Sequence, residues 1–413
     1  MVIAFLTLGC KLNYAETSTY ERGFKAAGLK VVPWQEKADI YLVNTCTVTG
    51  TSDAKSRNLV RKMHRINPDA RIIVTGCSAE LHRAEFEAIE GVARVFGAHE
   101  KSLVVPETLA LLGVYPKEII TNEIFGAYST GERTRSFLKV QDGCNNYCKY
   151  CTVPYARGES RHIPICECVK GAEAIAAEGV KEIVLTGVNT GDFGRTTGES
   201  FLDLLKALDK VGGIERYRIS SIEPNLITEE IVDWIASGTK FQPHFHIPLQ
   251  TGSDTLLKAM GRKYDTAFFA DRIAYIRSHM EGPGKPKVFF GIDTMVGLPG
   301  ETEGLFRETY DFIARLRPAF IHVFPYSRRP GTPAAKMPGQ LTEAVKHERV
   351  LALEELCERL HSEFVEENRG IRERVLFESK EKDGSMSGYT GNYIRITRPY
   401  DASLVGRLTD III

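Results

Sequence analysis

The chain has 413 residues, and its 53 basic and 53 acidic side chains give a formal net charge of zero. This length allows two or three domains with their own cores. The balanced charge excludes a field over the whole molecule that would attract nucleic acid, so any RNA site must be a local patch. The sequence has no signal-peptide pattern and no apolar run near the roughly 20 residues that cross a bilayer. We therefore expect a cytoplasmic protein, no membrane contact, and nine reduced cysteines suited to metal or redox roles.

The first 125 residues or so alternate between apolar runs and helical segments. We expect strands at 2–10, 39–46 and 71–77, each followed by a helix, the first of which is capped by Asn13. Strand followed by helix, three times over, predicts a doubly wound parallel sheet in a domain spanning 1–126.

Each of these three strands ends in a cysteine, namely Cys10, Cys46 and Cys77. The carboxyl ends of parallel strands lie along one edge of a sheet, where ligands bind. Any one of these cysteines could be an ordinary buried residue at a strand end. Because all three occupy equivalent places, the pattern favours a site with three thiolates that binds metal.

Basic residues also gather on the second helix, which carries Lys55, Arg57, Arg61, Lys62, His64 and Arg65. This stripe is either a solvated face or a contact for RNA phosphates, which would make binding depend on salt.

A polar segment at 126–136 predicts a linker, and a second series of strands and helices follows it. The expected strands are 137–142, 182–189, 217–223, 244–251, 287–295 and 319–326. Six strand–helix units are fewer than the eight of a closed barrel, so we expect an open partial barrel over 133–369. A helix from Thr342 to Asn368 ends this domain, and alternating short strands predict a small antiparallel β domain over 370–413.

The start of the second domain carries three closely spaced cysteines, Cys144, Cys148 and Cys151, on a turn rich in glycine and asparagine. Their CxxxCxxC spacing suits one 4Fe-4S cluster, which normally has four thiolates. Three thiolates leave one iron open to a substrate or cofactor. The alternatives are a zinc site, which usually needs paired CxxC units, and three unrelated buried thiols. We interpret the remaining cysteines, Cys166, Cys168 and Cys357, as packing residues.

The cysteine loop, with Tyr150 before its last cysteine, resembles the signature of radical S-adenosylmethionine (SAM) enzymes. Over nearly the whole chain the sequence resembles the methylthiotransferases of that superfamily, and most closely the branch that acts on N6-threonylcarbamoyladenosine in tRNA. The resemblance rests on LGCKLN, NTCTVT, TGC, KVQDGCNNYCKYCTVPYARG, SSIEP, GLPGET, YSRRPGTPA and a tail similar to a TRAM domain. It implies two 4Fe-4S clusters, on Cys144, Cys148 and Cys151 and on Cys10, Cys46 and Cys77.

The resemblance also implies the reaction. The first cluster would reduce SAM to methionine and a 5′-deoxyadenosyl radical, which takes hydrogen from C2 of the adenine, and the second would provide sulfur for methylthiolation. The rival substrates are isopentenyl-adenosine in tRNA and an aspartate of a ribosomal protein. A rival of another class is an iron-sulfur module that binds RNA or senses redox state without turnover.

Further site residues follow from the same resemblance. At the strand ends and in the cysteine loop, the expected SAM contacts are Tyr150, Gly187, Asn189, Ser221, Glu223, Gln250 and Pro299. The expected contacts to substrate are Arg157, Arg161 and Arg329, although salt bridges at the barrel rim would explain arginines there equally well. The family usually has two arginines around a serine after YARG, whereas this chain keeps only Arg161. The expected partners are a tRNA anticodon stem-loop and a flavodoxin or ferredoxin as electron donor, with the protein a monomer.

Overall fold

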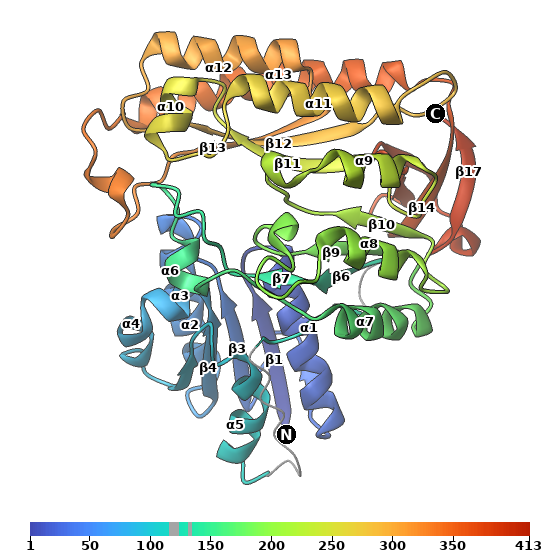
Figure 1. Cartoon of the computed structure of the whole chain (residues 1–413). Coiled ribbons are helices and arrows are strands. Elements are labelled where there is room, and N and C mark those ends of the chain that lie inside the picture. Colours follow the sequence, from blue (N-terminus) through green and yellow to red (C-terminus); the bar gives the residue numbers. More distant parts are fainter. Residues whose placement is uncertain (115–123, 131–133) are drawn as a thin grey trace.

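The computed structural model describes residues 1–114, 124–130 and 134–413. The linker predicted at 126–136 and the domain boundary at residue 133 lie partly outside the described residues, so the domain limits stay predictions. Three regions follow one another along the chain (Figure 1): an N-terminal α/β region, a curved sheet covered by helices, and a small C-terminal sheet. This architecture confirms the predicted fold class. Within the described part, no helix has the length and apolar character that crossing a membrane requires.

The N-terminal region is a five-stranded parallel sheet in the order β2-β1-β3-β4-β5. Its strands are β1 (Val2–Thr7), β2 (Lys30–Val32), β3 (Ile40–Thr45), β4 (Arg71–Gly76) and β5 (Val92–Phe96). All six residues of the central β3 are buried, which explains its continuous apolar run. The two edge strands were not predicted because β2 has only three residues and three of the five residues of β5 are exposed or half-buried.

The helices of this region alternate with the strands along the chain. They are α1 (Lys11–Ala26), α2 (Gly50–Ile66), α3 (Cys77–Leu81), α4 (Arg83–Glu87) and α5 (Val104–Leu111). The prediction that Asn13 caps α1 is wrong, because Cys10 is the N-cap and Asn13 lies in the first helical turn. Two of the cysteines that were predicted to bind metal therefore lie at helix starts. Cys10 is the N-cap of α1, and Cys77 is the first residue of α3.

The second region contains six parallel strands, as the predicted open barrel requires. They are β6 (Arg135–Lys139), β9 (Glu182–Thr186), β10 (Arg216–Ile219), β11 (His244–Gln250), β12 (Phe289–Val296) and β13 (Phe320–Pro325). They pair as β10-β9-β6 and β11-β12-β13, and isolated parallel bridges, including Ser221 to His246, join β10 to β11. The apolar core lies between this curved sheet and its outer helices.

Helices alternate with these strands, and the longer ones cover their outer face (Figure 1). They are α6 (Val153–Arg157), α7 (Ile165–Ala177), α8 (Phe201–Asp209), α9 (Glu229–Ala236), α10 (Asp254–Ala259), α11 (Thr266–Met280), α12 (Glu303–Leu316) and α13 (Glu343–Glu367). The predicted cap of α13 is present, because the Thr342 side chain accepts a hydrogen bond from the Val345 amide. Cys357 of this helix is buried, and its sulfur accepts a hydrogen bond from the Ile321 amide at 3.2 Å.

The C-terminal region is a four-stranded antiparallel sheet in the order β16-β15-β14-β17. Its strands are β14 (Arg372–Lys380), β15 (Ser385–Tyr389), β16 (Arg395–Pro399) and β17 (Leu408–Ile412). The sequence did not predict β15, whose residues are mostly small. Its Gly388 is required by close packing, because a Cβ there would lie 2.6 Å from the Leu376 carbonyl oxygen.

A buried carboxylate joins this sheet to the barrel. Glu182 of β9 lies 2.9 Å from the Arg218 Nε, and Arg135 and Arg216 lie 3.6 Å away. Arg218 also donates to the carbonyls of Thr390 and Gly391, both at 2.7 Å. Arg218 therefore pairs with the Glu182 carboxylate and also donates hydrogen bonds to the backbone of the C-terminal region.

This carboxylate makes stability depend on pH. Burial alone would raise the pKa of Glu182, but Arg218 and Arg135 lower it to about 2. Because the pKa is lower in the folded state, the stabilisation is present above the unfolded pKa of about 4.3 and is lost as pH falls toward 2. We expect the free energy of unfolding, measured by denaturant titration, to fall between pH 5 and pH 2.

A Glu182→Gln variant should be about 3–5 kcal/mol less stable at pH 7, because three arginines lose their counter-charge. Its unfolding free energy should also fall less steeply below pH 5. The exposed Glu173 of α7 is the matched control, and Glu173→Gln should follow the wild-type curve. Equal stability of Glu182→Gln and wild type at pH 7 would contradict this account.

Candidate functional site

The strand-end cysteines lie at the carboxyl ends of β1, β3 and β4, which are neighbours in the N-terminal sheet. Cys46 is buried and packs against Gly9, where an added Cβ would lie 2.8 Å from the Cys46 sulfur. Gly9 has φ of +100°, so the close approach and the backbone conformation both require glycine. Cys10 and Cys77 are close enough to raise the pKa of Cys46 beyond the effect of burial. The three thiols therefore converge at one edge of the sheet.

Asn13 holds the two turns that carry Cys10 and Cys46 at this edge of the sheet. Its buried side-chain amide donates to the Leu8 carbonyl at 2.8 Å and to the Thr45 carbonyl at 2.9 Å. These carbonyls precede Cys10 and Cys46. Its oxygen accepts a hydrogen bond from Arg157 of the barrel region at 2.5 Å. One amide thus ties together two cysteine-bearing turns and the neighbouring region.

The second set, Cys144, Cys148 and Cys151, lies on a loop closed by two short antiparallel strands, β7 (Gln141–Asp142) and β8 (Arg161–His162). Gly143 starts the loop with φ of +72°, and a Cβ there would lie 1.9 Å from the Glu159 carbonyl oxygen. Buried Gln141 donates to the Gly143 carbonyl at 2.8 Å and accepts from the Val188 and Asn189 amides at 2.9 Å. The loop is therefore held at the carboxyl end of β9.

Each sulfur of this loop accepts a hydrogen bond. Backbone amides of Asn146 and Val153 lie 3.4 Å from the sulfurs of Cys144 and Cys151. Arg262, which follows α10, lies 3.0 Å from the Cys148 sulfur and 2.5 Å from Glu223. Hydrogen bonds of this kind stabilise thiolates and tune an iron-sulfur centre.

The chemistry of both cysteine sets fits an iron-sulfur cluster. Burial raises the pKa of Cys46 and Cys144 to about 11 and that of Cys151 to about 12, so these thiols stay protonated until a metal centre replaces the proton. In the described part of the chain, no three cysteine sulfurs all lie within 4.8 Å of one another. A single tetrahedral zinc would set them about 3.8 Å apart, from Zn–S bonds of about 2.3 Å. The wider spacing suits the larger cluster.

The Arg262 contact leads to a redox prediction. Replacing Arg262 by Gln removes a positive charge and a hydrogen bond beside Cys148, so the reduction potential of the cluster on this loop should become more negative. Redox titration followed by electron paramagnetic resonance measures this shift. Lys149→Gln removes the same charge from an exposed residue next to Cys148, and its shift should be smaller. An unchanged potential in Arg262→Gln would refute the role of Arg262.

Four of the predicted SAM contacts, Tyr150, Gly187, Asn189 and Glu223, contact Gln141 or Arg262, the residues that hold this loop. Gly187 packs against Gln141, and the Asn189 side chain accepts from the Glu223 amide at 3.3 Å. Ser221 bridges to β11, and the Tyr150 hydroxyl lies 3.4 Å from Arg262. Gln250 at the end of β11 has φ of +70°, a conformation that is rare for a residue other than glycine and concentrates at functional sites. Pro299 lies in the turn after β12. Their contact with SAM stays a prediction.

A buried ionic network separates the two cysteine sets. Glu16 accepts from Lys101 at 2.8 Å, from Lys139 at 3.0 Å and from Arg157 at 3.3 Å. Asp142, directly before the loop, accepts from Lys139 at 2.7 Å and from Arg157 at 2.8 Å. Arg157 also donates from Nε to the Cys77 sulfur at 3.1 Å. The cations outnumber the carboxylates, and this surplus suits an anionic cluster on thiolates.

The predicted substrate arginines are engaged inside the protein. Arg157 belongs to the network, and Arg161 donates to the Arg157 carbonyl at 2.6 Å and to the Glu159 carbonyl at 3.1 Å. Arg329 follows β13 and donates to Thr47 at 2.8 Å and to Asp53, so it joins the barrel to the N-terminal region. Contact of these arginines with substrate stays a prediction.

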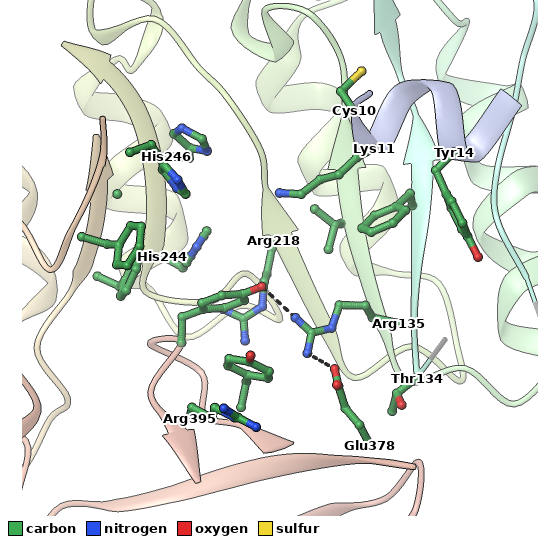
Figure 2. A pocket seen from close by; sticks show the side chains of 18 of the residues that line it. Cys10, Lys11, Tyr14, Thr134, Arg135, Arg218, His244, His246, Glu378 and Arg395 are labelled. Carbon is green, nitrogen blue, oxygen red and sulfur yellow. Dashed lines mark hydrogen bonds and ion pairs between the residues drawn. The ribbon is translucent and has the colours of Figure 1, made fainter. Parts of the chain in front are cut away.

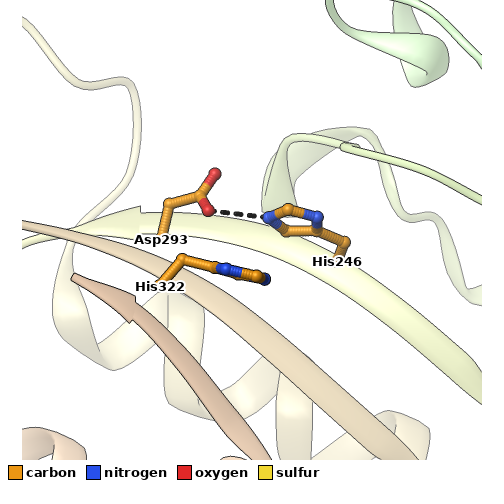
Figure 3. Close-up of side chains that lie close together, drawn as sticks. All are labelled: His246, Asp293 and His322. Carbon is orange, nitrogen blue, oxygen red and sulfur yellow. Dashed lines mark hydrogen bonds and ion pairs between the residues drawn. The ribbon is translucent and has the colours of Figure 1, made fainter. Parts of the chain in front are cut away.

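A third group of polar side chains lies on the inner face of the barrel strands. The ligand atoms of His246, Asp293 and His322 lie within 4.8 Å of one another (Figure 3). Two imidazoles and a carboxylate are able to hold a divalent metal ion. His246 Nε2 and Asp293 Oδ1 share a hydrogen bond at 2.8 Å, and the His322 ring stacks on His246.

Several residues of the site escaped sequence reasoning. Glu16, Lys101, Lys139 and Asp142 are charged residues on separate elements, and their meeting depends on how the two regions pack. Arg262 belongs to the loop after a short helix. The only available signal was the position of Gln141 and Asp142 just before the cysteine loop.

Comparison with known proteins agrees with this architecture. A model of the "Radical SAM superfamily" matches residues 138–313, and one of the "Uncharacterized protein family UPF0004" matches residues 2–97. A solved structure of TsrM from Kitasatospora setae, described as a radical S-adenosylmethionine methyltransferase, aligns with a TM-score of 0.59 at 15% identity, over 81% of this chain and 74% of that one. The partial barrel and its cysteine loop thus define a radical SAM enzyme.

Proteins that are similar over nearly the whole length of this chain show which family of radical SAM enzymes it belongs to. The threonylcarbamoyladenosine tRNA methylthiotransferase MtaB of Bacillus subtilis is 40% identical, covering 99% of this chain and 93% of that protein. A tRNA-2-methylthio-N(6)-dimethylallyladenosine synthase of Pelotomaculum thermopropionicum is 32% identical, over 98% of this chain and 93% of that protein. The chain belongs to the radical SAM methylthiotransferase family, which makes it a transferase that uses SAM and an iron-sulfur cluster, as the sequence predicted.

Proposed function

We propose that this protein adds a methylthio group to C2 of N6-threonylcarbamoyladenosine beside the anticodon of tRNA. The name of the Bacillus subtilis relative supports this substrate, and its identity of 40% exceeds the 32% of the dimethylallyladenosine synthase. The observation that carries the proposal is the pair of three-cysteine sets, which share one buried network through Arg157. A methylthiotransferase needs both a radical source and a sulfur source within reach of one nucleoside.

In this proposal Cys144, Cys148 and Cys151 would hold the cluster that binds SAM, and Cys10, Cys46 and Cys77 would hold the second. When bound, the first cluster supplies the electron that cleaves SAM and the second supplies sulfur. The chain's own share is positioning. Gln141 ties the loop to β9, Arg262 orients toward Cys148, and Asn13 joins the turns that carry Cys10 and Cys46.

A cavity of about 890 Å³ supports a bulky substrate, because pockets for small ligands usually measure some 300–1,000 Å³. Cys10 forms one wall, and inward-facing residues of the barrel strands and side chains of the C-terminal sheet form others (Figure 2). A nucleoside turned out of an RNA loop could enter here and lie beside the Cys10 set. Exposed Tyr147 and Tyr155 of the cysteine loop offer rings on which neighbouring bases can stack.

The decisive test is mass spectrometry of tRNA nucleosides from cells with and without this gene. We expect loss of 2-methylthio-N6-threonylcarbamoyladenosine and accumulation of its precursor without the methylthio group. Loss of the methylthio derivative of isopentenyl-adenosine instead, or a methylthio group missing from a ribosomal protein, would overturn the proposed substrate. An unchanged profile, with no 5′-deoxyadenosine made by the reduced protein, would leave only the non-catalytic alternative.

The remaining expectations concern the location of the protein, its oligomeric state, its electron donor and its binding to RNA. We expect a cytoplasmic monomer that receives electrons from a flavodoxin or ferredoxin. Binding of the anticodon stem-loop should weaken as salt concentration rises, because contacts to phosphates release counterions.

A further inference from the structure

The cavity beside Cys10 lies at the meeting point of the three regions of the chain. Lys11 and Cys10 come from the start of α1, His246 and His322 from the barrel strands, and Tyr393 from the C-terminal region. The Lys11 side chain extends from the α1 start into the cavity, toward the side lined by the barrel histidines (Figure 2). A ligand in this space would touch the turn that carries a cysteine of the second set.

Three cationic side chains of this cavity are already paired, and one of them, Arg395, donates to Glu381 at 2.9 Å. Arg135 donates to the Tyr393 hydroxyl at 2.9 Å and to Glu378 at 2.7 Å. Arg218 is held by Glu182 at 2.9 Å and by carbonyls of the C-terminal region. These guanidinium groups are structural. Their positive charge still adds to the potential of the cavity.

Lys11 differs from them. Among the residues that the structure describes, its ammonium group has no hydrogen bond and no ion pair, and it is exposed to the cavity. The nearby carboxylate of Asp293 is taken by His246 at 2.8 Å. A lysine at the first residue of a helix also lies at the positive end of the helix dipole, and the first turn of α1 contains no acidic residue. The position therefore disfavours a cation unless an anion is bound there.

The two kinds of relatives differ in the charge of the group on N6 of their adenosine. The threonylcarbamoyl group ends in a carboxylate, whereas the dimethylallyl group is apolar. A lysine without a partner binds a carboxylate strongly, and it also rejects an apolar group, which would leave the ammonium unpaired in the complex.

We propose that Lys11 binds the carboxylate of the threonylcarbamoyl group and thereby selects this nucleoside over uncharged N6 derivatives. This inference rests on the proposed function. It places the N6 substituent between α1 and the barrel histidines, where His322 adds a further hydrogen-bonding group. Lys11 is thus a residue that determines specificity, and the adenine ring next to it lies near the Cys10 set.

The test is a binding comparison with the full-length protein carrying its clusters. The probes are anticodon stem-loop RNAs with N6-threonylcarbamoyladenosine, with its methyl ester, or with dimethylallyladenosine, followed by fluorescence anisotropy at fixed salt. The wild type should bind the free acid about 10- to 100-fold more tightly than the ester. In Lys11→Met this ratio should fall to about one, and Lys11→Arg should keep most of it.

The ratio of acid to ester within one variant cancels any general loss of affinity or of cluster. Lys25→Met is the matched control, because Lys25 lies in the last turn of the same helix and pairs on the surface with Glu21. It should keep the wild-type ratio. If Lys11→Met is insoluble, Lys11→Gln gives the same comparison.

Two results would overturn the inference in distinguishable ways. Wild type that prefers the acid, with a Lys11→Met ratio equal to it, would refute the role of Lys11 and leave the proposed function intact. Wild type that binds and methylthiolates the dimethylallyladenosine RNA in preference would refute the proposed function, and the inference with it.

Discussion

A Cys46→Ala variant is expected to form no methylthiolated RNA while the reduced protein still cleaves SAM to 5′-deoxyadenosine. The reason is spatial. Cys46 lies in the strand-end set of the N-terminal sheet, whereas the loop set is closed by its own strands and held by Gln141. Losing one of three thiolates should remove one cluster and spare the other. Iron and sulfide analysis should therefore find about half of the wild-type content.

The reciprocal variant separates the two sites further. Cys151→Ala should lose both SAM cleavage and RNA product, because the loop cluster is then incomplete. Cys166→Ala is the matched control, since Cys166 is an exposed cysteine in the first turn of α7. Its product yield and iron content should equal those of the wild type. Full product formation by Cys46→Ala would refute the second cluster site.

The sequence was sufficient to predict the elements that bring cysteines together. Buried parallel strands are continuous apolar runs, so the strands ending near Cys10, Cys46 and Cys77 could be recognised, and parallel topology then implied a common edge. The spacing of Cys144, Cys148 and Cys151 is local and needed no knowledge of the fold. Edge strand β2 and strand β15 were missed because neither has a long apolar run.

The sequence could not predict the contacts between regions. Glu16, Lys101 and Asp142 are far apart in the chain, and each alone is an ordinary charged residue that is usually exposed. Their burial together depends on how the N-terminal sheet packs against the barrel. The same holds for Arg329, which was predicted from the sequence to contact substrate and which pairs with Asp53 in the structure. Arginine patterns alone do not distinguish substrate contacts from bridges between regions.

Arg157→Met should have the second large effect, on stability and on the strand-end cluster together. Arg157 is fully buried and contacts Glu16, Asp142, Asn13 and the Cys77 sulfur. Breaking a buried ion pair usually costs about 3–5 kcal/mol. Lys101 and Lys139 still neutralise both carboxylates, so we expect a loss of about 3 kcal/mol in the free energy of unfolding. Cys77 also loses its charged hydrogen bond, so iron should leave the variant faster under a chelator.

Arg161→Met is the matched control for charge, because Arg161 reaches the same Asp142 only at 3.4 Å and its side chain is partly exposed. Its unfolding free energy should change by less than about 1 kcal/mol, and its iron should be retained. Arg157→Lys keeps the charge without the planar fork that reaches both Cys77 and Asn13, so it should recover stability more fully than iron retention. If Arg157→Met matched the wild type in both measurements, the buried network would have no role in linking the two cysteine sites. A loss of stability with unchanged iron release would restrict Arg157 to holding the two regions together.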